Sequence, residues 1–290
     1  MSTVSFPSIG LKPSLRSKFI QVPLNLTGRI HFDPRLYQVT FLLVFLFYGV
    51  AVLGWEVDAG KFALTFFTCL FTQFVFTSVT SKDYTSLLSA AISSLSLCLM
   101  LKTGEMATAA LAAFLSIAGK FVLRSNGKHF FNPTNFGICL TMLLTRQAWI
   151  SPGQWGNNAF LLLLIGSLGL LVLIRVKRID TAIAFLFSYI GLLSIRHILY
   201  QGWPADFLFH QLQNGTLLLF AFFMITDPVS TPSHPQARIG WALATGALAF
   251  VLQSYYFVNG APVWALFFLS PFTLLLDKLF KHSNFKWKQQ

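Results

Sequence analysis

Two polar motifs interrupt an otherwise apolar sequence, and the first runs from Lys128 to Gly137 (KHFFNPTNFG). Pro133 suits the first turn of a helix and Asn132 suits its N-cap, so this pair predicts a helix start. Asn135 and Gly137 lie one turn further on, where an amide and a missing side chain favour close approach of a ligand. The N-terminus of a helix also attracts anionic or electron-rich groups. The motif therefore predicts either a capped helix start or a binding site built on one.

The second motif runs from Phe222 to Pro232 (FFMITDPVSTP) and follows a Phe-rich segment. A carboxylate at the end of a membrane-length segment is costly, so Asp227 is a candidate functional residue. Asp before Pro, with Ser and Thr nearby, is also common turn chemistry, and Arg238 could pair with Asp227. We keep both interpretations open, with Thr226 and Ser230 as further candidates.

The composition predicts that these motifs lie on membrane-spanning helices. Of the 290 residues, 55% are hydrophobic and 10% are charged, whereas soluble domains carry about 25% charged residues. A membrane-spanning helix needs about 20 largely apolar residues. The sequence predicts an all-α integral membrane protein with ten such helices, at residues 37–55, 62–80, 85–102, 106–123, 134–150, 158–175, 180–200, 213–226, 239–258 and 262–280.

The distribution of basic residues predicts the orientation of these helices. With both termini in the cytoplasm, all of the 21 Lys and Arg lie on the inner side except Lys61, Lys102, Arg146 and Arg196. We expect a basic arm at 1–36, a membrane domain at 37–280 and a basic tail at 281–290, in the bacterial cytoplasmic membrane. The formal net charge of +12 then reflects the bilayer as partner and not nucleic acid.

The sequence contains few residues that could support metal binding or other enzymatic chemistry. The six His form no H-x-x-x-H or E-x-x-H pair, so we assign no metal, and no phosphate loop or nucleophile elbow supports a kinase or a hydrolase. We assign no catalytic residue. The cysteines, Cys69, Cys98 and Cys139, lie in apolar stretches and are expected to be buried small side chains. A metal or iron–sulfur site shared with a partner protein is the alternative.

The two motifs, in this order, resemble a membrane flavoprotein family. Residues 131–137 are similar to its F-N-P-A-A-F-G segment, and 222–232 to its F-F-M-A-T-D-P-V-S-x-P segment. The family contains the RnfD protein of the Rnf electron-transport complex and the NqrB protein of the sodium-pumping NADH:quinone oxidoreductase. This chain is compact, and in that respect it resembles short stand-alone members of the family.

The resemblance implies a fold, a cofactor and a set of site residues. Members have ten helices in two inverted five-helix repeats, and they hold riboflavin non-covalently near the two motifs. The site residues carried over to this sequence are Asn132, Asn135, Phe136, Gly137, Thr226, Asp227 and Ser230. Members of the full complexes also carry FMN on a Thr in an S/D-G-A-T-type motif, which is missing between the two motifs here. We therefore do not expect a covalent FMN–threonine bond.

The resulting prediction is a membrane electron-transport protein of the RnfD type that binds riboflavin or FMN non-covalently. It would be a component of an oxidoreductase, passing electrons to a partner protein or to a quinone. Two alternatives remain open, namely a small-solute transporter or channel with the same inverted repeat, and a membrane anchor for a redox or biosynthetic complex.

Overall fold

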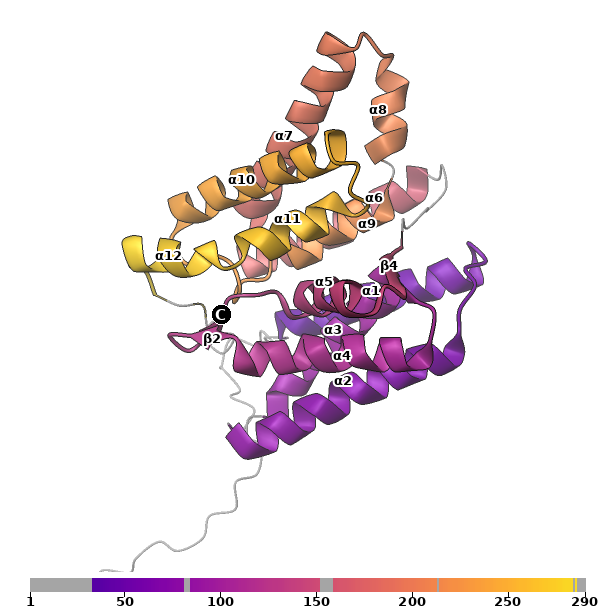
Figure 1. Ribbon diagram of the computed structural model, residues 1–290, viewed down its shortest axis with the longest axis vertical. Coiled ribbons are helices and arrows are strands. Elements are labelled where there is room, and N and C mark those ends of the chain that lie inside the picture. Colours follow the sequence, from indigo (N-terminus) through magenta and orange to yellow (C-terminus); the bar gives the residue numbers. More distant parts are fainter. Residues whose placement is uncertain (1–32, 81–83, 152–158, 213, 284, 286–290) are drawn as a thin grey trace, which may run out of the picture. The chain divides into compact units, whose positions relative to one another are not determined.

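The computed structural model describes residues 33–80, 84–151, 159–212, 214–283 and 285. The predicted basic arm therefore lies almost wholly outside the described residues, and the basic tail lies largely outside them. The described part is mostly helical (Figure 1). Its helical segments are α1 (Pro34–Ala51), α2 (Ala59–Thr80), η1 (Tyr84–Ser86), α3 (Leu87–Met100), α4 (Met106–Val122), α5 (Pro133–Thr145), α6 (Ala159–Val176), α7 (Ile179–Ser194), η2 (Ile195–Tyr200), α8 (Ala205–Leu212), α9 (Gly215–Leu219), η3 (Phe220–Met224), α10 (Pro235–Ser254), α11 (Ala261–Leu269) and α12 (Phe272–Leu279).

Each of the ten predicted segments overlaps a helix or a pair of consecutive helical segments. Within the described residues, two helices are long and apolar enough by themselves to cross a membrane, Ala59–Thr80 and Ile179–Tyr200. The second of these is α7 continued by the π-helical turns of η2. A third candidate is the pair α11 and α12, which bends by 49° between them.

The structure differs from the prediction of ten membrane helices and no strands in three places. The eight-residue helix α8 was not predicted, because it is too short for a membrane span. Strands β2 (Arg124–Ser125) and β3 (Lys128–His129) form a hairpin closed by Asn126 and Gly127, both with positive φ. Strands β1 (Leu101–Thr103) and β4 (Ala148–Ile150) pair antiparallel where α3 ends and after α5. All four strands join helix ends, so the helices still make the framework.

The helices pack in the same order twice along the chain. In the first series α1 contacts α3, α2 contacts α3 and α4, and α4 contacts α5. In the second series α6 contacts η3, α7 contacts η3 and α10, and α10 contacts α11. The two series meet through α1 against α6 and α5 against α11. The first and fifth helices of one series thus each touch their counterparts in the other.

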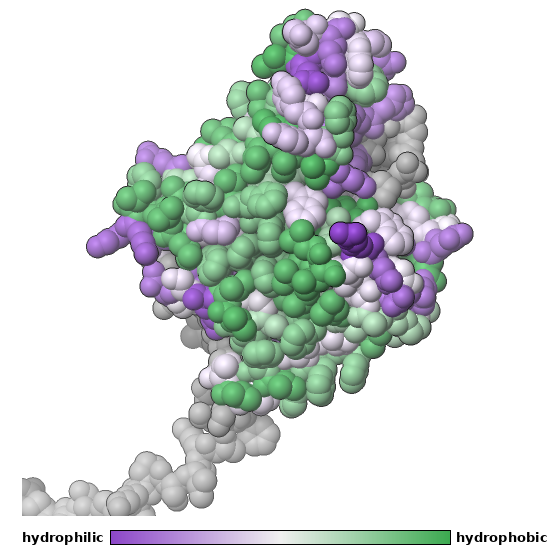
Figure 2. All heavy atoms as spheres, viewed as in Figure 1, coloured by the Kyte–Doolittle hydropathy of each residue, from purple (hydrophilic) through white to green (hydrophobic). Residues whose placement is uncertain are grey.

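The surface and the interior have the polarity expected of a protein in lipid. Large apolar side chains are exposed on many helices, including Phe47, Phe67 and Phe187, each at least 65% exposed. In Figure 2, hydrophobic residues cover the middle of the visible face, and hydrophilic residues gather toward its edges. Polar side chains such as Gln73 and Asn135 are fully buried between helices. Internal polar contacts are characteristic of helix packing in membranes.

Hydrogen bonds surround the bend between α11 and α12. Pro271 has no N–H, so the regular helical hydrogen bonds are interrupted there. The Ser270 hydroxyl donates to the Leu266 carbonyl at 2.7 Å, and the Thr273 hydroxyl donates to the Ser270 carbonyl at 2.7 Å. From α10, the Trp241 indole donates to the Leu269 carbonyl at 3.0 Å.

Candidate functional site

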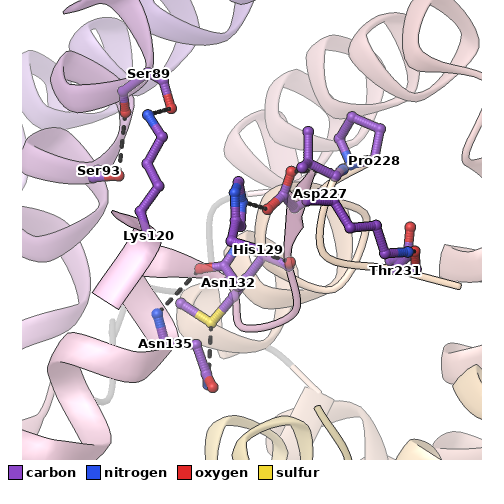
Figure 3. A network of polar contacts seen from close by, with 12 residues as sticks. Ser89, Ser93, Lys120, His129, Asn132, Asn135, Asp227, Pro228 and Thr231 are labelled. Atoms are coloured by element: carbon purple, nitrogen blue, oxygen red, sulfur yellow. Dashed lines mark hydrogen bonds and ion pairs between the residues drawn. The ribbon is translucent and has the colours of Figure 1, made fainter. Parts of the chain in front are cut away.

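A cavity of about 420 Å³ lies where the two motifs meet. Its walls are the start of α1, one side of α3 along its length, the ends of α4 and α6, the start of α5, and η3 with the turn after it. Figure 3 shows side chains of both motifs gathered in this region. From α4 to α6, consecutive helices present their last, first and last turns to the cavity, so they run antiparallel. The motifs, far apart in sequence, are therefore brought to one end of the helices.

Asp227 and His129 form one polar link between the motifs at the cavity wall. His129 Nε2 lies 3.4 Å from Asp227 Oδ2, and the Val229 amide donates to Asp227 Oδ1 at 3.2 Å. Burial alone would raise the pKa of the Asp227 carboxyl, but hydrogen bonds from His129, Val229 and Ser230, with the charge of His129, lower that pKa below its ordinary value. The ionised Asp227 carboxylate therefore stabilises the fold fully at a pH above the ordinary carboxyl pKa. This stabilisation is lost as the pH falls through the lowered pKa of Asp227.

A hydrogen bond from the start of α7 stabilises the turn that contains Asp227. Arg178, the N-cap residue of α7, donates to the Pro228 carbonyl at 3.2 Å. Burial, and then repulsion from Arg238, lowers the pKa of Arg178 to about 10, which leaves it charged at neutral pH. Arg238 itself pairs with Asp180. The pairing of Arg238 with Asp227 that the sequence suggested is therefore wrong, because Arg238 pairs with Asp180 and Asp227 pairs with His129.

Lys128 fixes the second half of the same turn. Its ammonium pairs with Asp277 near the end of α12 and donates to the Thr231 carbonyl at 2.8 Å. The Ser233 amide donates to the other oxygen of Asp277 at 2.8 Å. The side chains of Lys128 and Asp277 are 7% and 15% exposed. A mostly buried ion pair thus joins the first motif, the second motif and the last helix.

Asn132 caps a helix and also lines the cavity. Its side-chain oxygen accepts from the Asn135 amide at 3.1 Å, so it caps α5. Its side-chain nitrogen donates to the Met224 carbonyl at 3.1 Å, and the residue also lines the cavity. Thr226 and Asp227 line the same cavity from the other motif. Three of the seven residues predicted to form the site are therefore on its wall.

The other four lie elsewhere. Asn135 is fully buried and donates to the Val263 carbonyl of α11 at 2.7 Å, while its side-chain oxygen has no partner within the described residues. Phe136 packs on Gly119 of α4 and on other aromatic rings. A Cβ on Gly137 would lie 1.8 Å from the Ser116 hydroxyl, so this glycine permits close packing of α4 and α5. Ser230 is buried and hydrogen-bonds Asp227 from within the turn.

Sequence reasoning missed the opposite wall of the cavity. Four serines of η1 and α3, spaced by three, four and three residues, line it: Ser86, Ser89, Ser93 and Ser96. Lys120, in the last turn of α4, lies beside Ser89 and Ser93 (Figure 3) and donates to Ser89 and to Gln73 of α2. The helical spacing of the serines and a lysine inside an apolar segment were visible signals.

Part of the chain is similar in sequence to known proteins. It is 32% identical over 129 residues to the D component of the ion-translocating oxidoreductase complex of Stutzerimonas stutzeri, covering 44% of this chain and 36% of the relative. The corresponding protein of Pseudomonas paraeruginosa is 35% identical over 107 residues, covering 36% and 29%. The matched stretch is therefore about a third of the length of these relatives. The profile of the NQR2, RnfD, RnfE family matches residues 140–286, which include the second motif. The chain belongs to the NQR2, RnfD, RnfE family of integral membrane proteins.

Proposed function

We propose that the chain is a membrane electron-transfer protein of the RnfD type. It binds a flavin, riboflavin or FMN, non-covalently and passes electrons to a partner redox protein or to a quinone. One observation carries this proposal: Asn132 of the first motif and Thr226 and Asp227 of the second line a single cavity. The relatives that are named as components of an ion-translocating oxidoreductase complex support it.

The cavity suits a planar aromatic ligand with polar edges. Its volume of about 420 Å³ lies within the range of about 300–1,000 Å³ for small-molecule sites. Phe222, Phe223 and Met224 line it beside aliphatic residues of α6. Asn132, Thr226 and Asp227 would orient the polar edge of a flavin, while the apolar wall would exclude water. The flavin would supply the redox chemistry, and the protein its position and electrostatic environment.

Thr108, Thr181 and Thr216 are the threonines that come nearest to an attachment site in this sequence, and each is hydrogen-bonded or buried. The Thr216 hydroxyl donates to the Ser151 carbonyl at 2.5 Å, and the Thr181 hydroxyl contacts Asp180 at 3.2 Å. Thr108, in the first turn of α4, is 5% exposed. None of the three lines the cavity at the two motifs. These contacts support non-covalent binding.

The purified protein tests this function directly. We expect the native protein to show the yellow absorbance bands of a flavin, and to release riboflavin or FMN when it is denatured. A denaturing gel should show no flavin fluorescence in the protein band. A colourless preparation that also binds no added flavin would contradict the function and favour a transporter or an anchor. Fluorescence that stays with the denatured band would contradict non-covalent binding alone.

Ten spans in two inverted five-helix halves are part of the same proposal. The packing order that occurs twice supports the two halves, since α1 to α5 then correspond to α6, α7, α9 with η3, α10 and α11. Each half has an odd number of helices, so the second is inverted relative to the first. Shorter helices are tolerated where they are buried against protein.

Both termini are expected in the cytoplasm of a bacterium, with the cavity opening on the same side. The reason is that nearly all Lys and Arg lie in the segments assigned to that side. Reporter fusions at Lys12 and at Gln290 should therefore both give a cytoplasmic signal. A periplasmic signal from either terminus would refute the ten-span arrangement.

Replacing Asp227 by Asn should weaken flavin retention without removing the protein from the membrane. The amide keeps the size and much of the hydrogen bonding of the carboxylate but loses the charge that faces His129. A hydrogen bond to a charged group contributes about 1.5–3 kcal/mol, so flavin content should fall several-fold at near-normal abundance. Flavin content is measured per mole of protein, with Asp206→Asn in the exposed part of α8 as control. An Asp227→Asn protein that keeps its full flavin content would show that Asp227 only shapes the turn.

A further inference from the structure

The cavity has two chemically different walls. Apolar residues of α6, α9 and η3 form one wall, including Val172, Leu219 and Phe222. The serine row of η1 and α3 (Ser86, Ser89, Ser93, Ser96) and Lys120 form the other. A purely aromatic ligand would use only the first wall. The second wall requires a group that accepts several hydrogen bonds.

Lys120 is the charged member of this polar wall. Its ammonium donates to Gln73 Oε1 at 3.0 Å and to Ser89 Oγ at 3.1 Å. Both acceptors are neutral, and no carboxylate lies within ion-pair distance among the described residues. An ammonium has three N–H donors, so these two bonds leave one for a ligand. A lysine in the last turn of a helix also complements the helix dipole, but that role does not require its head to reach across to α2 and α3.

In the part of the chain that the structure describes, the serine row has one hydroxyl that makes no internal hydrogen bond. The Ser93 hydroxyl donates to the Ser89 carbonyl at 3.1 Å. Ser96 is 9% exposed, and within the described residues its hydroxyl makes no hydrogen bond. Its oxygen is not among the fully buried atoms that lack a partner, so it is open to the cavity that Ser96 lines. A hydroxyl that is free to bind on the cavity wall is a second, independent sign of a polar ligand.

The charges on the lining do not balance. Arg35 pairs with Asp33, and His129 pairs with Asp227. Lys120 has no acidic partner among the described residues, and Arg124, which is exposed beyond the end of α4, donates to the Gly127 carbonyl. The only acidic residue among the described ones that line the cavity is Asp227, which His129 already contacts. A charge without a counter-charge inside a membrane-spanning helix is costly, so the Lys120 ammonium points to an anionic ligand group.

We propose that Lys120 and the serine row bind a phosphate group, so that the cavity takes FMN in preference to riboflavin. This inference rests on the proposed flavin function, because it assigns the polar wall to the phosphate and the apolar wall to the ring system. Phosphate accepts several hydrogen bonds at once and carries the charge that Lys120 lacks. Lys120 is a binding residue in this scheme, and no bond is formed or broken.

The decisive experiment compares the two flavins on the full-length protein in detergent. Equilibrium dialysis gives the dissociation constants of FMN and riboflavin for the parent, Lys120→Met, Lys120→Arg and Ser96→Ala. Lys102→Met is the matched control, since Lys102 lies at the opposite helix ends and donates to the Glu56 carbonyl. Thermal unfolding in inorganic phosphate, against chloride at equal ionic strength, reports anion binding without any flavin.

We expect the parent to bind FMN at least about tenfold more tightly than riboflavin, which is about 1.4 kcal/mol. Lys120→Met should remove most of this preference and leave riboflavin binding unchanged, while Lys120→Arg and Lys102→Met keep it. Phosphate should stabilise the parent but not Lys120→Met. Ser96→Ala loses no internal hydrogen bond, so it should fold and still weaken FMN binding, even if Lys120→Met fails to accumulate.

Each contrary result has its own meaning. Two results would overturn the phosphate site and leave the flavin function standing. The first is equal affinity of the parent for both flavins. The second is a preference for FMN that survives in Lys120→Met, or in Ser96→Ala if Lys120→Met does not accumulate. Phosphate stabilisation that depends on Lys120, without binding of either flavin, would support the anion site and overturn the flavin function. No flavin binding and no phosphate stabilisation would overturn both.

Discussion

Replacing Lys128 by Met is expected to prevent the protein from accumulating in a folded form. The substitution leaves the largely buried Asp277 carboxylate without its counter-charge and removes the bond to the Thr231 carbonyl. Removing one partner of a buried ion pair costs about 3–5 kcal/mol, which is a large part of the stability of a typical protein. The measurement is the fraction of detergent-extracted protein that stays monodisperse after heating, compared with the parent.

A second variant separates charge from packing in this prediction. Lys128→Met combined with Asp277→Leu removes both charges together, so it should recover a large part of the lost stability. Lys278→Met is the control, since Lys278 is exposed on the neighbouring position of α12. A Lys128→Met protein as heat-stable as the control would show that the pair does not hold the turn.

Gly137→Leu is expected to have the second large effect. A Cβ at this position would lie 1.8 Å from the Ser116 hydroxyl and 2.7 Å from the Ala112 carbonyl, and the carbonyl cannot rotate away. Overpacking of this kind costs about 1–3 kcal/mol or more, and Leu adds further atoms to the same gap. We expect α4 and α5 to separate, seen as low abundance and a lower unfolding temperature.

Gly240→Leu provides the comparison, because a Cβ at Gly240 meets no atom within 4 Å. This control should leave abundance and unfolding temperature near those of the parent. A Gly137→Leu protein that folds normally but loses flavin would instead support the direct role in binding that the sequence motif suggested.

The sequence predicted the helices well where local chemistry determines them. Pro133 and Asn132 begin α5 as expected, since capping depends only on neighbouring residues. Other helix ends were harder to predict: residues 239–258 were expected for a helix that runs from Pro235 to Ser254. The apolar run after Ser254 extended the prediction, but its backbone turns at Phe257, where φ is positive. Arg238 lies inside the helix because Asp180 pairs with it.

The site was predictable only in part, because a motif does not show which helix face meets which neighbour. Asn132 and Asp227 reach the cavity, whereas Asn135 turns to the Val263 carbonyl and Gly137 to α4. Those outcomes depend on packing between segments far apart in the chain. Lys120 was within reach of sequence reasoning, since an ionisable residue in an apolar segment is a functional candidate.

The bend between α11 and α12 has a mechanical consequence. An interrupted helix is often a pivot, because freed carbonyls let the two pieces swing. Here the Leu269 carbonyl accepts from Trp241 on α10, and the Leu266 and Ser270 carbonyls accept side-chain hydrogen bonds in addition to backbone ones. Ser270 and Thr273 are also almost completely buried. The bend is therefore a rigid connection between α11 and α12 and not a hinge. Since α12 carries Asp277, this rigid connection keeps the carboxylate in place for Lys128.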